Sequence, residues 1–335
     1  MDSVTQIVLG AAVGEAVLGK KVGNKAMLWG AIAGTVPDLD VFVKFFVDGL
    51  TADEMHRGFS HSLLFSVLFA PVLGWMAWKI HKNETATWKN WTLLMFLSLV
   101  THPLLDLHTA WGTQFFWPLP YKLTYNNIFV IDPLYTVPFM IFVILAMRRR
   151  RDDPKRQRLN TTGLIISCSY MLLTLVFKGV AHHQFTKSLE QQHIAYTELE
   201  SKPTPLNSLL WCGFVRSGDK ILMGYYSIFD GSAPVKFYAF PQHRELLGHL
   251  AGNDKILRLD HLTRGWYVIE KKDGKLYFDD VRFGQVGFGN DPRSIVASRE
   301  LIEKDGNLEL VQRQPEFRGE DFGKLFKRIV DKGVE

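Results

Sequence analysis

The 335-residue chain has a neutral mean hydropathy and a formal net charge of +5, from 39 Lys and Arg against 34 Asp and Glu. The net excess is explained by one run, Arg148–Arg151, which flanks an apolar segment together with three further basic residues. This placement is typical of a membrane-topology signal and argues against a nucleic-acid partner, while the two cysteines indicate neither a disulfide framework nor a thiolate metal site.

The neutral mean hydropathy conceals two halves of different character. Residues 1–183 contain the long apolar runs, whereas residues 184–335 have charges spread throughout. We therefore expect a multi-pass α-helical membrane domain of about six segments, followed by a small α+β soluble domain. The six segments are expected at about 4–19, 26–47, 61–80, 91–110, 130–147 and 161–181.

Glycines four residues apart mark the first two segments. Gly10 and Gly14 lie in the first, and Gly30 and Gly34 lie in the second. Small residues at this spacing let helix backbones approach closely, so we expect tight packing there. The N-terminus lacks the basic region of a cleavable signal peptide, and the first segment is therefore expected to stay in the mature protein.

Basic residues occupy alternate loops between the segments. These residues are Lys20, Lys21 and Lys25, then Lys79, Lys82 and Lys89, then the Arg148 run. The positive-inside rule places all three loops in the cytoplasm. We accordingly expect a multi-pass protein of the cytoplasmic (inner) membrane whose C-terminal domain is extracytoplasmic, as are the loops 48–60 and 111–129.

The C-terminal half shows strand and turn patterns. Two hairpins are expected, one turning at Ser217-Gly218-Asp219 and one at Asp273-Gly274, because alternating apolar residues flank these turn residues. Helical patterns are present at 242–251 and 320–332.

Six side chains that can bind metal interrupt the apolar segments. They are Asp38, Asp40, His56, His61, His102 and Asp106. At 1.5 Å per helical residue, Asp38 lies about 20 Å from Lys25, and His102 about 17 Å from Trp91. Against a hydrocarbon core of about 30 Å, these depths agree and predict one recessed site in the outer leaflet. Ionisable residues are rare in membrane segments and usually face a cavity, a partner or a ligand.

His102 and Asp106 are four residues apart, so on a helix both side chains point the same way. A mixed set of imidazole and carboxylate suits a divalent cation, most of all Zn²⁺, with Mn²⁺ as a second choice. Arg57 lies between the two histidines of the third segment and is a candidate for holding an anionic substrate or a developing oxyanion. His108 is a candidate acid or base.

Other interpretations of these residues stay open. Asp38 is also a candidate helix cap after Pro37, and Asp40 a candidate surface carboxylate. Ser60 is a candidate N-cap for the third segment, which would leave His56 and His61 as surface residues.

The residues that carry these patterns resemble the YdjM-like family of membrane-bound metal-dependent hydrolases. The matching elements are 1–5, 37–40, 56–62 and 102–106 with Thr109 and Gly112, and in the C-terminal half 205–211 and 280–284. The resemblance implies a hydrolase, with a distant similarity to zinc-dependent phospholipase C. Family members commonly carry a Thr-His pair near the N-terminus, where this chain has Thr5-Gln6. Either one ligand is lost or Gln6 orients a water, because an amide oxygen binds zinc less well than imidazole does.

The sequence therefore predicts an integral membrane hydrolase that acts on a membrane lipid or lipid-linked (phospho)ester through a metal-activated water. A non-catalytic membrane protein for metal binding, transport or assembly is the alternative from another class. Transport favours ligands near the midplane with access from both sides, whereas these ligands gather toward one side. A metal-free lipid phosphatase is a second enzymatic alternative, although its Ser-Gly-His element is absent from this sequence.

Overall fold

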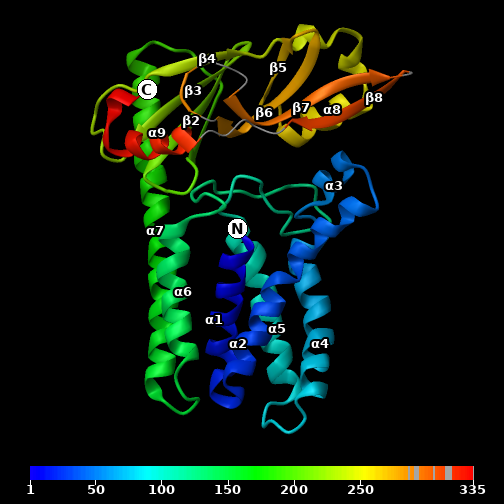
Figure 1. Cartoon of the computed structure of the whole chain (residues 1–335), viewed down its shortest axis with the longest axis vertical. Coiled ribbons are helices and arrows are strands. Elements are labelled where there is room, and N and C mark those ends of the chain that lie inside the picture. The colour runs from blue at the N-terminus through cyan, green and yellow to red at the C-terminus, as the bar shows by residue number, and fades with distance from the viewer. Residues whose placement is uncertain (286, 290–293, 305, 314–318, 335) are drawn as a thin grey trace. The chain divides into compact units, whose positions relative to one another are not determined.

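The computed structural model describes residues 1–285, 287–289, 294–304, 306–313 and 319–334 (Figure 1). The chain divides into two compact units. The helical unit comprises Met1–Leu175 and Pro205–Asn207, and the sheet unit comprises Val176–Thr204 and Ser208–Glu335. The division falls inside one long helix, α7 (Pro154–Gln191), so the two ends of this helix belong to different units.

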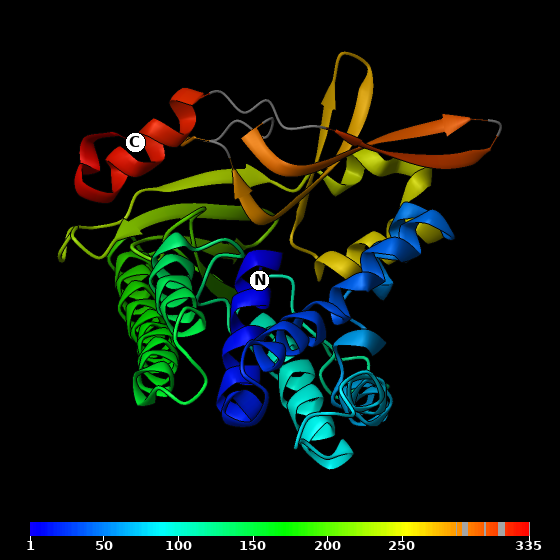
Figure 2. The same cartoon turned by 60° about the horizontal axis from the view of Figure 1, so that its bottom comes forward.

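The helical unit is a bundle whose longer helices run side by side (Figures 1 and 2). These helices are α1 (Ser3–Val22), α2 (Asn24–Thr35), α4 (Leu63–Ile80), α5 (Trp88–Asp106), α6 (Pro133–Met147) and the first part of α7. Between α2 and α4 the chain forms the 3-10 helix η1 (Pro37–Phe45), α3 (Gly49–Met55) and the 3-10 helix η2 (Phe59–His61). All six expected apolar segments are thus largely helical.

Side chains fix where three of these helices begin. The carboxylate of Asp2 accepts the backbone N–H groups of residues 4 and 5 at the start of α1. Thr87 and Asn90 form a reciprocal capping box at the start of α5. Asp132 caps α6, and Pro133 follows it at the first helical position, where no backbone N–H is needed.

The glycines of α1 and α2 confirm the prediction of close packing. A Cβ atom built on Gly10 would lie 2.2 Å from the carbonyl oxygen of Gly30, and one built on Gly30 would lie 2.1 Å from that of Gly10. No side chain fits between backbones at this distance, so only glycine allows the contact. Gly34 continues it, with a Cβ position 2.8 Å from the carbonyl oxygen of Gln6. The C-terminal end of α2 is therefore held directly against α1.

The expected count of six membrane crossings is not supported by helix length and composition. Within the described residues, α4 and α7 are long and apolar enough to cross a membrane, and α2 with η1 makes a third span if the bent pair counts as one. The helix α6 is apolar but has only 15 residues. Helices α1 and α5 bury polar side chains against their neighbours, which lowers their hydropathy without excluding them from the bundle.

The three basic loops meet at one end of the helical unit. Lys25 Nζ lies 2.5 Å from Glu84 Oε1, and Arg151 donates a hydrogen bond to the carbonyl oxygen of Lys21 at 3.0 Å. Arg156 of α7 forms a buried ion pair with Glu15 of α1, with Nε to Oε1 at 2.7 Å and Nη2 to Oε2 at 2.5 Å. We refer to the end of the helical unit where the three basic loops meet as the basic end of the bundle.

The described residues of the sheet unit form two four-stranded antiparallel sheets. One has the order β1 (Glu198–Pro203), β2 (Leu210–Ser217), β3 (Lys220–Ser227), β4 (Phe237–Pro241). The other has the order β5 (Tyr267–Lys272), β6 (Lys275–Gln285), β7 (Ile295–Lys304), β8 (Asn307–Arg313). Both expected hairpins are confirmed: Ser217 pairs with Lys220, and Lys272 with Lys275.

Four helical elements complete the described part of this unit after its first strands. The helix expected at 242–251 is a 3-10 segment, η3 (Arg244–Gly252), whose backbone breaks at Gly248 with φ of +48°. It is followed by α8 (Asp254–Thr263), which the sequence patterns did not predict. The expected C-terminal helix is confirmed as α9 (Gly319–Val330), followed by the short 3-10 helix η5 (Lys332–Val334). Leu325 and Ile329 of α9 join side chains from both sheets in one apolar core.

Candidate metal centre

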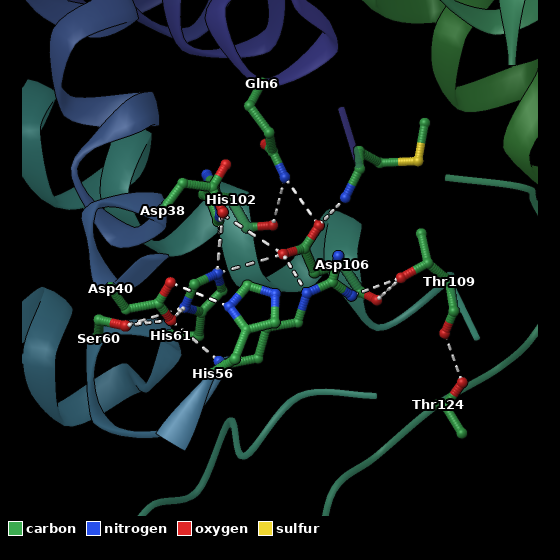
Figure 3. Close-up of polar contacts among 12 residues, drawn as sticks. Gln6, Asp38, Asp40, His56, Ser60, His61, His102, Asp106, Thr109 and Thr124 are labelled. Carbon is green, nitrogen blue, oxygen red and sulfur yellow. Dashed lines mark hydrogen bonds and ion pairs between the residues drawn. The ribbon is translucent and has the colours of Figure 1, made fainter. Parts of the chain in front are cut away.

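Two short 3-10 helices and the last turn of α5 bring four candidate ligands together (Figure 3). The axis of η1 is bent by 44° from that of α2, and η1 carries Asp38 in its first turn. His61 ends η2, just before α4 begins. His102 and Asp106 lie one turn apart on α5. The bend lets residues from three chain segments face one point at the end of the bundle opposite the basic end.

Four ligand atoms of these residues converge. The Nε2 atoms of His61 and His102 are 3.2 Å apart. Asp38 Oδ1 lies 3.3 Å from each Nε2, and Asp106 Oδ2 lies 3.4 Å from each. The four ligand atoms all lie within 4.8 Å of one another. The side chains of His61, His102 and Asp106 are fully buried, whereas that of Asp38 is 23% exposed and leaves one approach open.

Hydrogen bonds to the other ring nitrogens fix the histidine tautomers. Nδ1 of His102 lies 2.6 Å from the carbonyl oxygen of Gly34, which can only accept, so this nitrogen carries the proton. Nδ1 of His61 lies 3.0 Å from Ser60 Oγ and 3.3 Å from Asp40 Oδ2. Protonated Nδ1 atoms leave both Nε2 atoms with a lone pair directed at the common point, which is the arrangement of metal-binding histidines.

The two oxygens of Asp106 have different partners. Oδ1 accepts a hydrogen bond from Gln6 Nε2 at 2.9 Å and also contacts the amino group of Met1. Oδ2 is buried and has no hydrogen-bond donor within the described part of the chain, although it faces both histidines and Arg57 Nε, the latter at 3.4 Å. One oxygen is therefore anchored, and the other is free to bind an ion.

This donor set fits a divalent cation. Two imidazole lone pairs and two carboxylate oxygens repel one another at 3.2–3.4 Å unless positive charge lies between them. In a tetrahedral site with ligand distances of about 2.0–2.1 Å, neighbouring ligand atoms lie about 3.3–3.4 Å apart. Five of the six separations agree with this spacing, whereas the carboxylate oxygens of Asp38 and Asp106 lie farther apart, within the 4.8 Å that spans all four atoms. The group could therefore hold a metal ion.

Asp40 and His56 lie beside this group without belonging to it. Asp40 Oδ1 accepts from His56 Nδ1 at 3.0 Å, and Asp40 Oδ2 accepts from the backbone N–H of Arg57 at 3.0 Å and from Ser60 Oγ at 3.1 Å. The ring of His56 packs edge-on against His61, with ring centroids 5.9 Å apart. Asp40 and His56 thus both contact His61, one of the four converging residues. Ser60 bonds to Asp40 and His61. The N-cap of α4 is Ser62 and not Ser60.

Arg57 reaches Asp106 from a strained backbone conformation. Its φ angle is +58°, in the left-handed region that residues other than glycine seldom adopt. Its side chain is buried, with Nη1 donating to Thr109 Oγ1 at 2.6 Å. Its Nε lies next to Asp106 Oδ2 and has no hydrogen-bond acceptor among the described residues. A buried guanidinium with an unused donor is placed at the edge of the four-residue group.

Residues 1–185, more than half of the chain, match the YdjM inner membrane protein family. The chain belongs to this family. No curated protein and no solved structure matches it significantly. The YdjM match ends within α7 and contains every residue of the candidate metal centre. An inner-membrane location follows from the family together with the apolar helices.

Gln6 and His108, both expected to take part in catalysis, differ in their contacts with the four converging residues. Gln6 donates to Asp106 and, at 3.3 Å, to the carbonyl oxygen of His102, so it supports two members of the group. His108 bonds through Nδ1 to Asn127 at 2.8 Å and packs against Tyr125. The described contacts of His108 do not include any of the four converging residues.

Sequence patterns missed the backbone and terminal groups that complete the site. The Gly34 carbonyl and the Met1 amino group carry no side-chain signal, so only the fold reveals their contacts with His102 and Asp106. Lys122 was also missed, although it donates to the carbonyl oxygen of His56 at 3.0 Å. It lies in the loop 111–129, whose apolar and aromatic composition hides a single basic residue.

Proposed function

We propose that this YdjM protein is an integral membrane metal-dependent hydrolase that acts on a lipid or lipid-linked phosphoester. The observation that carries the proposal is the convergence of four ligand atoms within 4.8 Å of one another beside a buried arginine. Asp38, His61, His102 and Asp106 would hold the ion. Asp40 and His56 stay in the proposal as residues that support this group.

The donor set favours zinc over a harder cation. Two neutral imidazoles and two carboxylates form a mixed nitrogen and oxygen set, whereas Mg²⁺ and Ca²⁺ prefer oxygen ligands alone. Mn²⁺ accepts the same ligands and is the second choice. A bound divalent ion would supply an activated water and polarise the scissile group. The partly exposed side of Asp38 is the approach by which water and substrate would reach it.

Arg57 gives the site its preference for anionic substrates. Its guanidinium is held by Thr109 on one nitrogen and lies beside Asp106 with Nε unused. A phosphoryl oxygen that gains charge during the reaction would accept from this donor, and a buried donor needs no reorganisation to reach it. A carboxylic ester has less charge to offer Arg57, which is why a phosphoester is the preferred substrate class.

Orientation in the membrane is part of the proposal. The three basic loops meet at one end of the bundle, and the candidate metal centre lies at the opposite end. The positive-inside rule puts the basic end in the cytoplasm, which would place the centre in the outer leaflet and the C-terminal domain outside the cell membrane. A six-crossing path would follow if α2 with η1, α1, α5 and the short α6 cross beside α4 and α7 as members of the bundle.

The test begins with metal content. Protein purified in detergent without chelator should contain about one zinc or manganese per chain, and His102→Ala should contain none. His81→Ala is the matched control, since His81 packs on Trp91 and accepts from Trp29 Nε1 away from the site. Equal metal contents in the His102→Ala variant and the wild type would refute this site.

Activity is tested on a panel of phospholipids and polyprenyl phosphates in mixed micelles. Hydrolysis should disappear on chelation, return with zinc or manganese, and fall at least 100-fold in Asp106→Asn. Asp132→Asn is the control, because this buried carboxylate caps α6 and lies outside the site. Turnover that survives full chelation favours the metal-free phosphatase. Bound metal without turnover on any lipid favours metal binding, transport or assembly.

A further inference from the structure

Asp40 contacts four residues of the short segment 56–61 at once. Its two oxygens contact His56 Nδ1, the backbone N–H of Arg57, Ser60 Oγ and His61 Nδ1, at 3.0, 3.0, 3.1 and 3.3 Å. The sequence expectation made Asp40 a ligand of the ion. With its oxygens engaged in this way, and with Asp40 outside the converging group, a different role fits the geometry better.

We propose that Asp40 is a positioning residue that couples the metal ligand His61 to the anion-binding residue Arg57. This inference rests on the metal site proposed above. Toward His61, Asp40 acts directly and through Ser60, whose Oγ lies 3.0 Å from Nδ1. A carboxylate on the far nitrogen of a ligating histidine fixes the ring and makes Nε2 a stronger donor to the ion.

Toward Arg57, Asp40 acts on the backbone. The left-handed conformation at Arg57 persists only if neighbouring groups hold it. Asp40 Oδ2 accepts the N–H of this residue, and the backbone N–H of Gln114 donates to its carbonyl oxygen at 3.0 Å. The turn directs the guanidinium to Thr109 and Asp106. One carboxylate therefore sets the geometry of the metal ligand and of the substrate-binding cation together.

The experiment uses Co²⁺ as a visible probe of coordination and inorganic phosphate as a probe of Arg57, both with full-length protein in detergent. In Asp40→Asn, the affinity for Co²⁺ should fall roughly 10–100-fold, the usual effect of losing such a partner. At saturating Co²⁺, however, the intense absorption of a four-coordinate site should be the same as in the wild type. Asp38→Asn, which removes a ligand, should lose that absorption even at saturation.

The phosphate titration tests the coupling. Arg57→Lys should weaken phosphate binding to the Co²⁺ protein while leaving Co²⁺ affinity unchanged, whereas Asp40→Asn should weaken both. In the double variant, the two losses of phosphate affinity should not add, because Asp40 acts on phosphate through Arg57. Asp48→Asn is the control, since Asp48 caps α3 outside the site. Ser60→Ala removes one contact of the same network and should give a smaller loss of Co²⁺ affinity.

The outcomes separate the two proposals. Wild-type Co²⁺ affinity in Asp40→Asn overturns the positioning role, and so does a loss of four-coordinate absorption at saturation, which would make Asp40 a ligand. Additive losses of phosphate affinity overturn the coupling. A wild-type protein that binds no Co²⁺ overturns the metal site itself, whereas Co²⁺ binding without hydrolysis overturns only the proposed activity.

Discussion

The two ends of the helical unit bury acidic side chains in different ways. At the basic end, Glu15 meets Arg156 through two short hydrogen bonds, and Arg156 also donates to Asn24. At the opposite end, Asp38 and Asp106 meet the unprotonated nitrogens of His61 and His102. In the first cluster an arginine pairs with the carboxylate directly, whereas in the second four acceptor atoms face one point and the cations, the Met1 amino group and Arg57, contact only Asp106 at its edge. Burial of a charge alone thus says little about function. The balance of hydrogen-bond donors and acceptors around the buried carboxylate shows whether it is paired within the protein or available to an ion.

The sheet unit shows a third way to bury a carboxylate. Asp279 of β6 is fully buried, and neither of its oxygens has a hydrogen-bond donor within the described residues. Burial raises the pKa of this carboxyl to about 7. A proton thus neutralises the charge of Asp279, as an arginine does for Glu15 and as an ion would do at Asp106. Four predictions test this comparison.

The largest effect is expected from chelation. Removing the ion should lower the thermal unfolding temperature of the wild type, because a ligand present at 1,000 times its Kd contributes about 4 kcal/mol. Asp106→Asn should start from a lower unfolding temperature and show no response to chelator. Glu15 and Arg156 need no ion, so chelation should not weaken the basic end. Hydrogen exchange of α5 and α7 amides, with and without chelator, locates the change.

Breaking the ion pair at the basic end should destabilise the bundle without changing its metal affinity. Glu15→Gln leaves Arg156 buried and unpaired, which costs about 3–5 kcal/mol. The apparent metal affinity should stay at the wild-type value. Replacing both residues, as Glu15→Gln with Arg156→Met, should recover much of the stability. The measurements are thermal unfolding and metal titration, and a metal affinity that fell with stability would show that the two ends are not independent.

The glycine contact between α1 and α2 should influence both properties. In Gly30→Ala the new methyl group would meet the Gly10 carbonyl oxygen, which forces the helices apart and costs about 3 kcal/mol, the upper part of the usual range. Because Gly34 and Asp38 follow on the same chain segment, metal affinity should also fall. Gly179→Ala is the control, with no atom within 4 Å of the added Cβ. Unchanged metal affinity in Gly30→Ala would separate packing from ligation.

The smallest effect concerns pH. The folded state holds the Asp279 proton up to about pH 7, whereas the unfolded chain releases it near its ordinary value of 3.8. Between these values the folded state binds more protons, so stability falls as pH rises and levels off above pH 7. From pH 5 to pH 8 the loss is about 2–3 kcal/mol. In Asp279→Asn this slope should vanish, as judged by exchange of β6 amides against the wild type at each pH. A slope that persisted would assign it to another group.

Much of the fold followed from local patterns. Glycine spacing predicted the contact of α1 with α2, and the turn residues at 217–219 and 273–274 predicted both hairpins. These predictions succeed because each depends on the backbone freedom or volume of a few neighbouring residues. The break at Gly248 and the helix α8 were missed, since 3-10 geometry and short surface helices leave weak periodic signals.

The candidate metal centre, like the fold, was predicted from the sequence only in part. Sequence alone determined which side chains gather, because Asp and His are costly in apolar segments and equal spacing along helices predicts equal depth. Only the tertiary structure decided how they are arranged. The bend before η1 turns Asp38 toward the histidines and Asp40 toward the turn at Arg57, although the two carboxylates are two residues apart. A rotation of this kind depends on how α1, α2 and α5 pack, and packing of distant segments is not encoded in any local spacing.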